Sequence, residues 1–208
     1  MYDVNHNGIP FTRTLNDSDL QGFLTHDELQ TLLAQNGCVG IRVYNAVASR
    51  NDASQRVIAV GVRENGSEFE NLYQLSGSFT PGSMPTGGRA ANGRQEAVDL
   101  TGRNVSTSLH FAAFFSKKVV NDLLANNNGQ AVDGVGFFVV DLGGGIFSHV
   151  GTAYVNALQA ANSSIQSDMP CPDKCAKLVN PNTTDFANAA TVSSTTTGSD
   201  AGIYLQRW

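Results

Sequence analysis

A change in hydrophobic period within residues 25–62 constrains the fold more than any other feature of this sequence. Three leucines recur at the spacing of one helix face: Leu29, Leu32 and Leu33. Thr25 followed three residues later by Glu28 is typical of a capping box, in which each side chain accepts a hydrogen bond from the other residue's backbone N–H. Gly37 suits the left-handed conformation that ends many helices. The pattern predicts a helix over residues 25–36.

Beyond this helix the apolar residues change to a period of two, which is typical of a half-buried strand. One face of the first strand carries three apolar residues: Val39, Ile41 and Val43. A polar, turn-rich loop over residues 48–54 separates this strand from a second one over residues 56–62. A helix that packs on such an antiparallel hairpin lets each element bury its apolar face.

The same pattern returns later in the chain. Residues 23–25, Phe-Leu-Thr, match residues 114–116, Phe-Phe-Ser, at an offset of 91 (114 minus 23). Ser116 then takes the N-cap position, and the apolar stripe falls on three further residues: Val120, Leu123 and Leu124. The first strand matches residues 135–139 at an offset of 96 (136 minus 40), and residues 148–155 take the place of the second strand. We interpret this agreement as an internal duplication.

The sequence therefore predicts an α+β protein of two repeated helix-plus-antiparallel-hairpin units, which either share one sheet or form separate sheets. Residues 76–94 are rich in Gly, Ser and Pro, as expected of a long connection. The predicted organisation is a first unit, a linker region, a second unit and a tail, with the bounds 1–75, 76–105, 106–160 and 161–208.

Charge limits the classes of partner. The chain has 13 Lys and Arg against 18 Asp and Glu, so no basic field favours nucleic acid. Only 15% of residues are charged, against roughly 25% in typical soluble domains, so the surface repels its own copies weakly. The sequence contains no apolar run long enough to span a membrane and no signal-peptide pattern at its N-terminus. We expect a cytoplasmic protein, with extracellular export by a leaderless route as the alternative.

One candidate metal site lies near the N-terminus. Asp3, Asn5 and Asn7 alternate ahead of Gly8, which resembles the opening of a calcium-binding loop. Such a loop places a bidentate Glu at its twelfth position, but here that position is Thr14. A polar turn is therefore the favoured interpretation. Calcium is the one cofactor that the sequence suggests, and otherwise none is expected.

Residues 139–145, Val-Val-Asp-Leu-Gly-Gly-Gly, resemble the phosphate-binding turn of the actin and sugar-kinase superfamily. In that turn, backbone N–H groups face a nucleotide phosphate. The superfamily needs two large α/β domains and a second phosphate turn, and neither is found in this sequence. In the register of the repeat the stretch is the hairpin loop of the second unit, and we favour that interpretation.

The three cysteines are too few for a disulfide scaffold. Cys171 and Cys175 could form a small disulfide ring or half of a metal site. A local turn is favoured, disulfide-linked if the protein reaches an oxidising compartment. Cys38 begins a predicted core strand and is expected to pack as a small hydrophobic residue.

An asymmetry between the two units suggests a partner surface. The outer face that carries Arg42 and Tyr44 in the first strand is apolar in the second unit. The chain also ends in an apolar segment, residues 203–208, which contains the only Trp and is expected to dock on its own or a neighbouring subunit. The candidate interface residues are Arg42, Tyr44, Phe138, Val140, Tyr204, Leu205 and Trp208.

Two stretches carry a resemblance to a known group of proteins. They are residues 36–44, Asn-Gly-Cys-Val-Gly-Ile-Arg-Val-Tyr, and residues 57–66, Val-Ile-Ala-Val-Gly-Val-Arg-Glu-Asn-Gly. Together with Cys171-Pro-Asp-Lys-Cys175, they resemble small uncharacterised proteins of Bacteroidetes-type bacteria. Departures are Arg63 and Glu64, where an acidic turn residue is usual, and the doubled unit. The resemblance implies a bacterial source and a recurrent fold unit, and it implies no activity.

No catalytic constellation is apparent in the sequence. The four histidines form no metal-binding spacing, and there is no Gly-x-Ser-x-Gly elbow. We therefore expect a non-enzymatic structural protein that self-assembles as a homo-oligomer, filament or scaffold subunit. The alternatives are a calcium- or small-ligand-binding module that uses Asp3, Asn5 and Asn7, and a secreted effector whose activity no motif in the sequence indicates.

Overall fold

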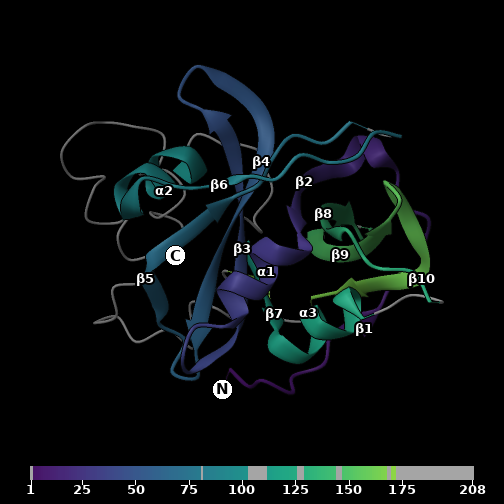
Figure 1. The fold of residues 1–208 in the computed structure, drawn as a ribbon, viewed down its shortest axis with the longest axis horizontal. Helices are drawn as coiled ribbons and strands as arrows, with labels where there is room; N and C mark the ends of the chain where they lie inside the picture. The colour runs from purple at the N-terminus through teal and green to yellow at the C-terminus, as the bar shows by residue number, and fades with distance from the viewer. Residues whose placement is uncertain are drawn as a thin grey trace.

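The computed structural model describes residues 2–80, 82–102, 112–125, 129–143 and 147–167, and the backbone of residues 170–171. Strands make up 50% of the described chain and helices 19%. The strands form two antiparallel sheets that lie side by side (Figure 1). The predicted fold class, two helix-plus-hairpin units, is therefore wrong: the protein is mostly β.

The smaller sheet has the strand order β1-β10-β9-β8-β2. Its strands are β1 (Ile9–Pro10), β10 (Leu158–Gln166), β9 (Phe147–Val155), β8 (Gly134–Asp141) and β2 (Leu20–Thr25). The larger sheet has the order β11-β7-β3-β4-β5-β6. Its strands are β11 (Pro170–Cys171), β7 (Ala112–Ser116), β3 (Cys38–Ser49), β4 (Asp52–Arg63), β5 (Glu68–Leu75) and β6 (Arg89–Ala90).

Three α-helices and one 3-10 turn are present among the described residues: α1 (His26–Leu33), α2 (Gly93–Gly102), α3 (Lys117–Leu124) and η1 (Asp17–Asp19). Helices α1 and α3 contribute to the core between the sheets, and α2 covers the other face of the larger sheet (Figure 1). None of the described helices is long and apolar enough to cross a membrane.

The predicted helix starts are confirmed. The Thr25 hydroxyl accepts from the backbone N–H of Glu28 at 3.3 Å, and the Glu28 carboxylate accepts from that of Thr25 at 2.9 Å, so the capping box is complete. Ser116 caps α3 by accepting from the N–H of Val119 at 3.1 Å. The helix ends at Leu33, three residues before the predicted end at 36, and Gly37 in the turn that follows has a φ of 81°. All six residues of the two predicted apolar stripes are buried: Leu29, Leu32, Leu33, Val120, Leu123 and Leu124.

A reciprocal exchange of strands explains why the predicted units are wrong. The first half of the chain runs β2-α1-β3-β4-β5, and the second half runs β7-α3-β8-β9-β10. Each half places the strand before its helix in the other half's sheet, because β2 pairs with β8 and β7 pairs with β3. Each hairpin is also extended to three strands, by β5 and β10. The sequence duplication itself stays a prediction.

Strand pairing also changes the correspondence between the halves. Thr25 lies opposite Gly134, and Ser116 lies opposite Gly40. By their pairing partners the strands take equivalent places at an offset of 94 (134 minus 40), two residues less than the offset of 96 in the sequence match. Because two is the period of a strand, the shift preserves which face each residue takes. Arg42, opposite Phe114, therefore takes the same place in its sheet as Gly136, opposite Phe23, whereas the sequence match sets it against Phe138.

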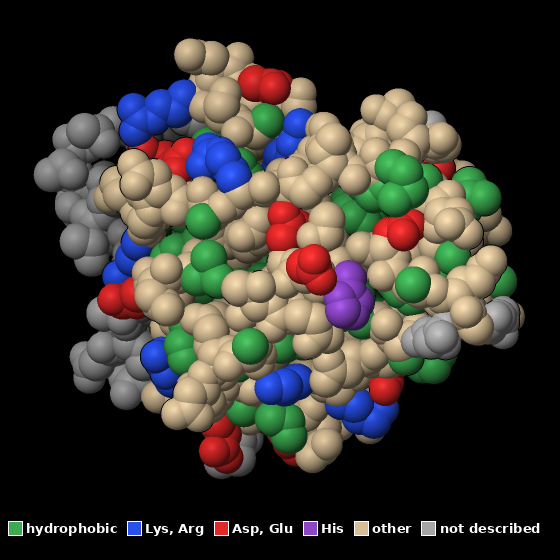
Figure 2. All heavy atoms as spheres, viewed as in Figure 1, with side chains coloured by type: hydrophobic (Ala, Val, Ile, Leu, Met, Phe, Trp, Pro, Cys, Tyr) green, Lys and Arg blue, Asp and Glu red, His purple; other side chains and the backbone are tan. Residues whose placement is uncertain are grey.

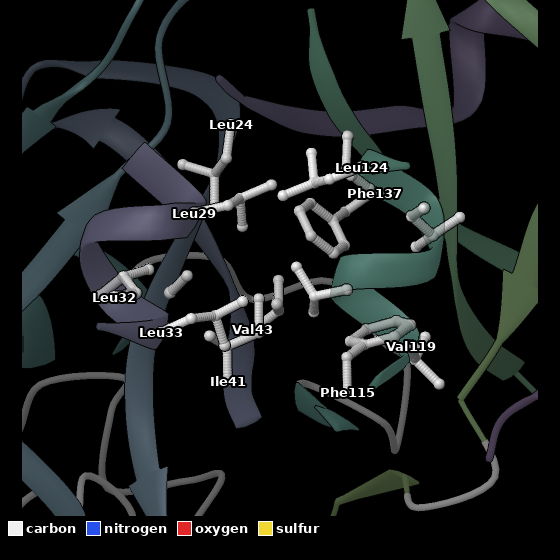
Figure 3. Close-up of a cluster of buried hydrophobic side chains, with 14 of the residues drawn as sticks. Leu24, Leu29, Leu32, Leu33, Ile41, Val43, Phe115, Val119, Leu124 and Phe137 are labelled. Atoms are coloured by element: carbon white, nitrogen blue, oxygen red, sulfur yellow. The ribbon is translucent and has the colours of Figure 1, made fainter. Parts of the chain in front are cut away.

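The main core belongs to both halves. In Figure 3, six residues of the first half, Leu24, Leu29, Leu32, Leu33, Ile41 and Val43, face four of the second half, Phe115, Val119, Leu124 and Phe137. Full burial of a side chain of this size stabilises a protein by about 1.5–3 kcal/mol. Neither half encloses these side chains by itself, so each half depends on the other for its core.

The stretch predicted as a linker is attached to the rest of the molecule. It contains β6 and α2, which pack against the larger sheet. The Glu28 carboxylate accepts a hydrogen bond from the backbone N–H of Gly88, in addition to its role in the capping box. The Phe79 ring lies 6.1 Å from that of Phe23 and 5.1 Å from that of Tyr154. These contacts hold the segment across both sheets.

Candidate functional site

The strongest cluster of polar groups in the described chain surrounds Arg42. Strand β3 supplies Arg42 and Tyr44, β5 supplies Glu68, and the N-terminal segment supplies Tyr2. Alternation along β3 places Arg42 and Tyr44 on the same face of the larger sheet. All four residues are at most 2% exposed. The expectation that Arg42 and Tyr44 face outward is therefore wrong, because β5 and the N-terminal segment contribute to their enclosure.

The guanidinium of Arg42 is held from several sides. Its Nη1 donates to Glu68 Oε1 at 2.8 Å, and its Nη2 donates to the Tyr2 hydroxyl at 2.9 Å and to the Gly66 carbonyl at 3.2 Å. The Tyr44 hydroxyl donates to the same Glu68 oxygen at 2.5 Å. Buried charges need this kind of pairing, because an isolated charge in an apolar interior is very costly.

The Tyr2 side chain packs against this cluster. Its ring meets that of Phe114 edge-on at a centroid distance of 4.7 Å, and the guanidinium carbon of Arg42 lies 5.4 Å from the Tyr2 ring centroid. Val39 and Val62 complete the apolar surroundings of Tyr2. Ionisable groups that are enclosed and hydrogen-bonded in this way tie the N-terminal segment to the larger sheet. This arrangement does not open them to a ligand.

The other two described interface candidates lie on the smaller sheet. Phe138 is fully buried in an apolar cluster with Leu15, Phe23, Val150 and Tyr154, and Val140 is partly buried beside it. Three further side chains at the border of this cluster are partly buried: Phe11, Leu20 and Phe79. Figure 2 shows hydrophobic side chains recurring over the part of the molecule that contains β2, β8 and β9. We call this cluster and its border the outer face of the smaller sheet.

The carboxylate of Asp17 orders this outer face. The Tyr154 hydroxyl donates to Asp17 Oδ1 at 3.0 Å, and Gln159 Nε2 donates to the same oxygen at 2.8 Å. Burial, together with the negative charge of Asp17, raises the pKa of Tyr154 well above its ordinary value of 10.0. The tyrosine therefore stays protonated and acts as a donor. Nothing in the local sequence links positions 17 and 154.

The proposed calcium turn forms a local hydrogen-bonded turn. Asp3 Oδ1 accepts from the backbone N–H of Asn5 at 3.0 Å, and Asn7 is exposed. The Ser116 hydroxyl donates to the carbonyl of His6, which joins this turn to the start of α3. Within the described residues, no group of three or more His, Cys, Asp or Glu is placed to hold a metal ion. Calcium binding stays an untested prediction.

The glycine-rich stretch connects two paired strands, as the hairpin interpretation predicted. Strand β8 ends at Asp141, which pairs with Phe147 at the start of β9. The Gly143 N–H donates to Asp141 Oδ1 at 2.7 Å, and Gly143 has a φ of 105°, which glycine adopts without strain. Residues 144–146 lie outside the described chain.

Cys38 packs as expected. It is 4% exposed, its thiol donates to the Gly40 carbonyl at 3.1 Å, and burial raises the pKa of this thiol. The backbone of Cys171 lies in β11 beside β7. Cys175 lies outside the described residues, so the predicted disulfide is untested. The tail residues predicted to dock also lie outside them: Tyr204, Leu205 and Trp208.

A buried histidine connects the two sheets. His149 on β9 is 0% exposed, and its Nε2 lies 3.1 Å from Oδ1 of Asn45 on β3. No local sequence pattern predicts this contact, because the two residues lie 104 positions apart. The pair adds a polar link to the apolar core that the halves share.

Comparison with known protein families, with curated proteins and with solved structures found no match.

Proposed function

We propose that this protein is a non-enzymatic structural subunit that assembles with copies of itself. The observation that carries the proposal is the closed network around Arg42. Its charged and hydroxyl groups bind one another inside the fold, and they anchor the N-terminal segment. Catalytic groups need access to a substrate, whereas these groups contribute to a single rigid interior.

The surface supports assembly between copies. Charged residues make up only 15% of the chain, so electrostatic repulsion between copies is weak. The outer face of the smaller sheet adds partly exposed apolar side chains, and Leu142, just beyond it, is 38% exposed. Contact between copies would remove such side chains from water, which favours association.

The edges of the two sheets argue against simple edge-to-edge stacking. Among the described residues, two-residue strands lie at three of the four sheet edges: β1, β6 and β11. The fourth edge strand, β2, forms a bridge with the 76–90 segment, between Phe23 and Gly77. Short and covered edges limit uncontrolled sheet extension. We therefore expect assembly with a defined geometry.

Size-exclusion chromatography combined with negative-stain microscopy tests the proposal. We expect the full chain to elute as assemblies whose fraction grows with concentration, and we expect discrete particles or filaments in the images. A variant that lacks residues 203–208 reports whether the apolar terminal segment contributes. Monomers at every concentration, for both the full and the shortened chain, would contradict a self-assembling role.

A further inference from the structure

Asparagine followed directly by glycine recurs five times in this chain, at positions 7, 36, 65, 92 and 128. Glycine has no Cβ, so its backbone N–H can approach the preceding asparagine side chain closely. Attack of that nitrogen on the side-chain amide is intramolecular, and no second molecule has to be brought into place. Asn128 lies outside the described residues, and the surroundings of the other four sites differ.

Asn36 and Gly37 occupy an open turn between α1 and β3. The Cys38 N–H donates to the Gln35 carbonyl at 2.9 Å, which closes the turn around them. The peptide that joins Asn36 to Gly37 makes no hydrogen bond to any described residue, through either its N–H or its carbonyl. Both residues are exposed, and a Cβ at Gly37 would meet no described atom within 4 Å. This peptide therefore has room to rotate until its nitrogen reaches the Asn36 side chain.

The nitrogens of Gly66 and Gly93 are held by hydrogen bonds. The Gly66 N–H donates to the Arg63 carbonyl and the Gly93 N–H donates to the Ala91 carbonyl, both at 2.8 Å. The Gly66 carbonyl also accepts from Arg42 at 3.2 Å, which limits rotation further. An attack at either site must first break a backbone hydrogen bond.

Gly8 is held by packing. A Cβ at this position would lie 2.4 Å from the Ile165 side chain and 2.7 Å from the carbonyl oxygen of Gln166. The next two residues form β1, which pairs with β10. The backbone after Asn7 therefore has little room to rotate, and the turn at Asn36 is the most open of the four sites.

We propose that Asn36 is a site of spontaneous imide formation in the folded protein. The backbone nitrogen of Gly37 bonds to Cγ of Asn36, and the Cγ–Nδ2 bond breaks. The Gly37 proton leaves with Nδ2 as ammonia, carried by water. A second water opens the cyclic imide at either carbonyl and gives aspartate or isoaspartate. Water is the only co-reactant, no electrons are transferred, and the reaction does not depend on self-assembly.

The modification would change the junction between α1 and β3. Either product places a carboxylate just beyond the C-terminal end of α1, where the helix dipole disfavours negative charge. Isoaspartate also lengthens the main chain just before Cys38, the buried first residue of β3. The modified chain should therefore be less stable than the original one.

Peptide mass spectrometry of the full chain tests the proposal. The folded protein is kept in mildly alkaline buffer made with water enriched in the heavy oxygen isotope, which marks every imide that opens. Samples taken over time are digested, and each Asn-Gly peptide is measured. Asn65 and Asn92 are matched controls within the same chain. We expect Asn36 to convert about two- to tenfold faster than either, because each control must first break one backbone hydrogen bond.

Two further samples separate the effect of structure from that of sequence. In urea the unfolded chain should convert all four sites at similar rates, because each has the same two reacting residues. The variant Asn36→Gln changes an exposed side chain and moves the amide one methylene group away from the Gly37 nitrogen. Heavy oxygen should then no longer enter at this turn, while the other sites convert as before.

Two results would overturn the proposal. Conversion of Asn36 in urea but not in the folded chain would mean that the turn holds its peptide in place. Equal rates at Asn36, Asn65 and Asn92 in the folded chain would mean that backbone hydrogen bonds do not select the site. Neither result bears on self-assembly.

Discussion

At the scale of single residues, Arg42 and Glu68 show how this protein uses charge. The two side chains are 1% and 0% exposed, and each depends on the other for neutralisation. Their pairing could not be predicted from the sequence, because Glu68 lies 26 residues away on a strand that the pattern did not reveal. Tyr2 was equally unexpected, since nothing local relates it to position 42.

Glu68→Gln should lower the free energy of unfolding by about 3–5 kcal/mol, because Arg42 would remain charged and buried without a counter-charge. Denaturant titration measures the loss. The matched control is Glu96→Gln, which alters the exposed pair with Arg89 and should cost no more than about 1 kcal/mol. Equal losses in the two variants would show that the buried pair contributes no more to the free energy of unfolding than the exposed pair.

Tyr154 should make stability fall in alkaline solution. Its pKa is raised in the folded chain, so above pH 10.0 the unfolded chain releases this proton while the folded chain keeps it. This contribution to stability is therefore complete below pH 10.0 and is lost as the pH rises, by up to about 1.4 kcal/mol per pH unit. Urea titrations of the wild type and of Tyr154→Phe from about pH 9 to about pH 11 should give a shallower decline for the variant. Identical declines would contradict the assignment.

At the scale of elements, local signals identified the helices but not the strands that precede them. The caps and apolar stripes of α1 and α3 lie within a few residues of one another, so the sequence was sufficient to predict both helices. Strands β2 and β7 end at the same residues, Thr25 and Ser116, that cap the helices. Such short runs carry little period-two signal, and their partners lie in the other half of the chain.

The two seam glycines give a matched test of the exchanged strands. Gly40→Ala and Gly134→Ala should each cost about 1–3 kcal/mol, because the added methyl group would meet backbone carbonyl oxygens that cannot move freely. Gly61→Ala is the control, since its Cβ would first meet the flexible end of the Gln35 side chain. Thermal unfolding would compare the three. A control as damaging as the seam variants would argue against close approach at the seams.

At the scale of the whole molecule, each half contributes one strand to the other half's sheet, and this exchange joins two similar halves into one folded unit. The sequence predicted matching halves but treated each as a separate helix and hairpin, because pairing between distant strands leaves no local pattern. The apolar residues of the two predicted units form a shared core between the sheets. The buried contact between His149 and Asn45 also joins the sheets.

The halves should consequently unfold together. Fluorophores attached at Ala53→Cys in the first half and at Leu158→Cys in the second, both exposed positions, should report coincident midpoints in denaturant. Cys171→Ser and Cys175→Ser keep the labelling specific. Midpoints that separate would mean that each half has enough core to fold by itself.

Self-association is the central claim of this account, and the molar mass of the full chain tests it most directly. Light scattering coupled to size-exclusion chromatography, over a range of loading concentrations, measures that mass without reference to shape. We predict a mass that rises with concentration above the 22.0 kDa of one chain, toward multiples of it. A mass of 22.0 kDa at every concentration would contradict the claim.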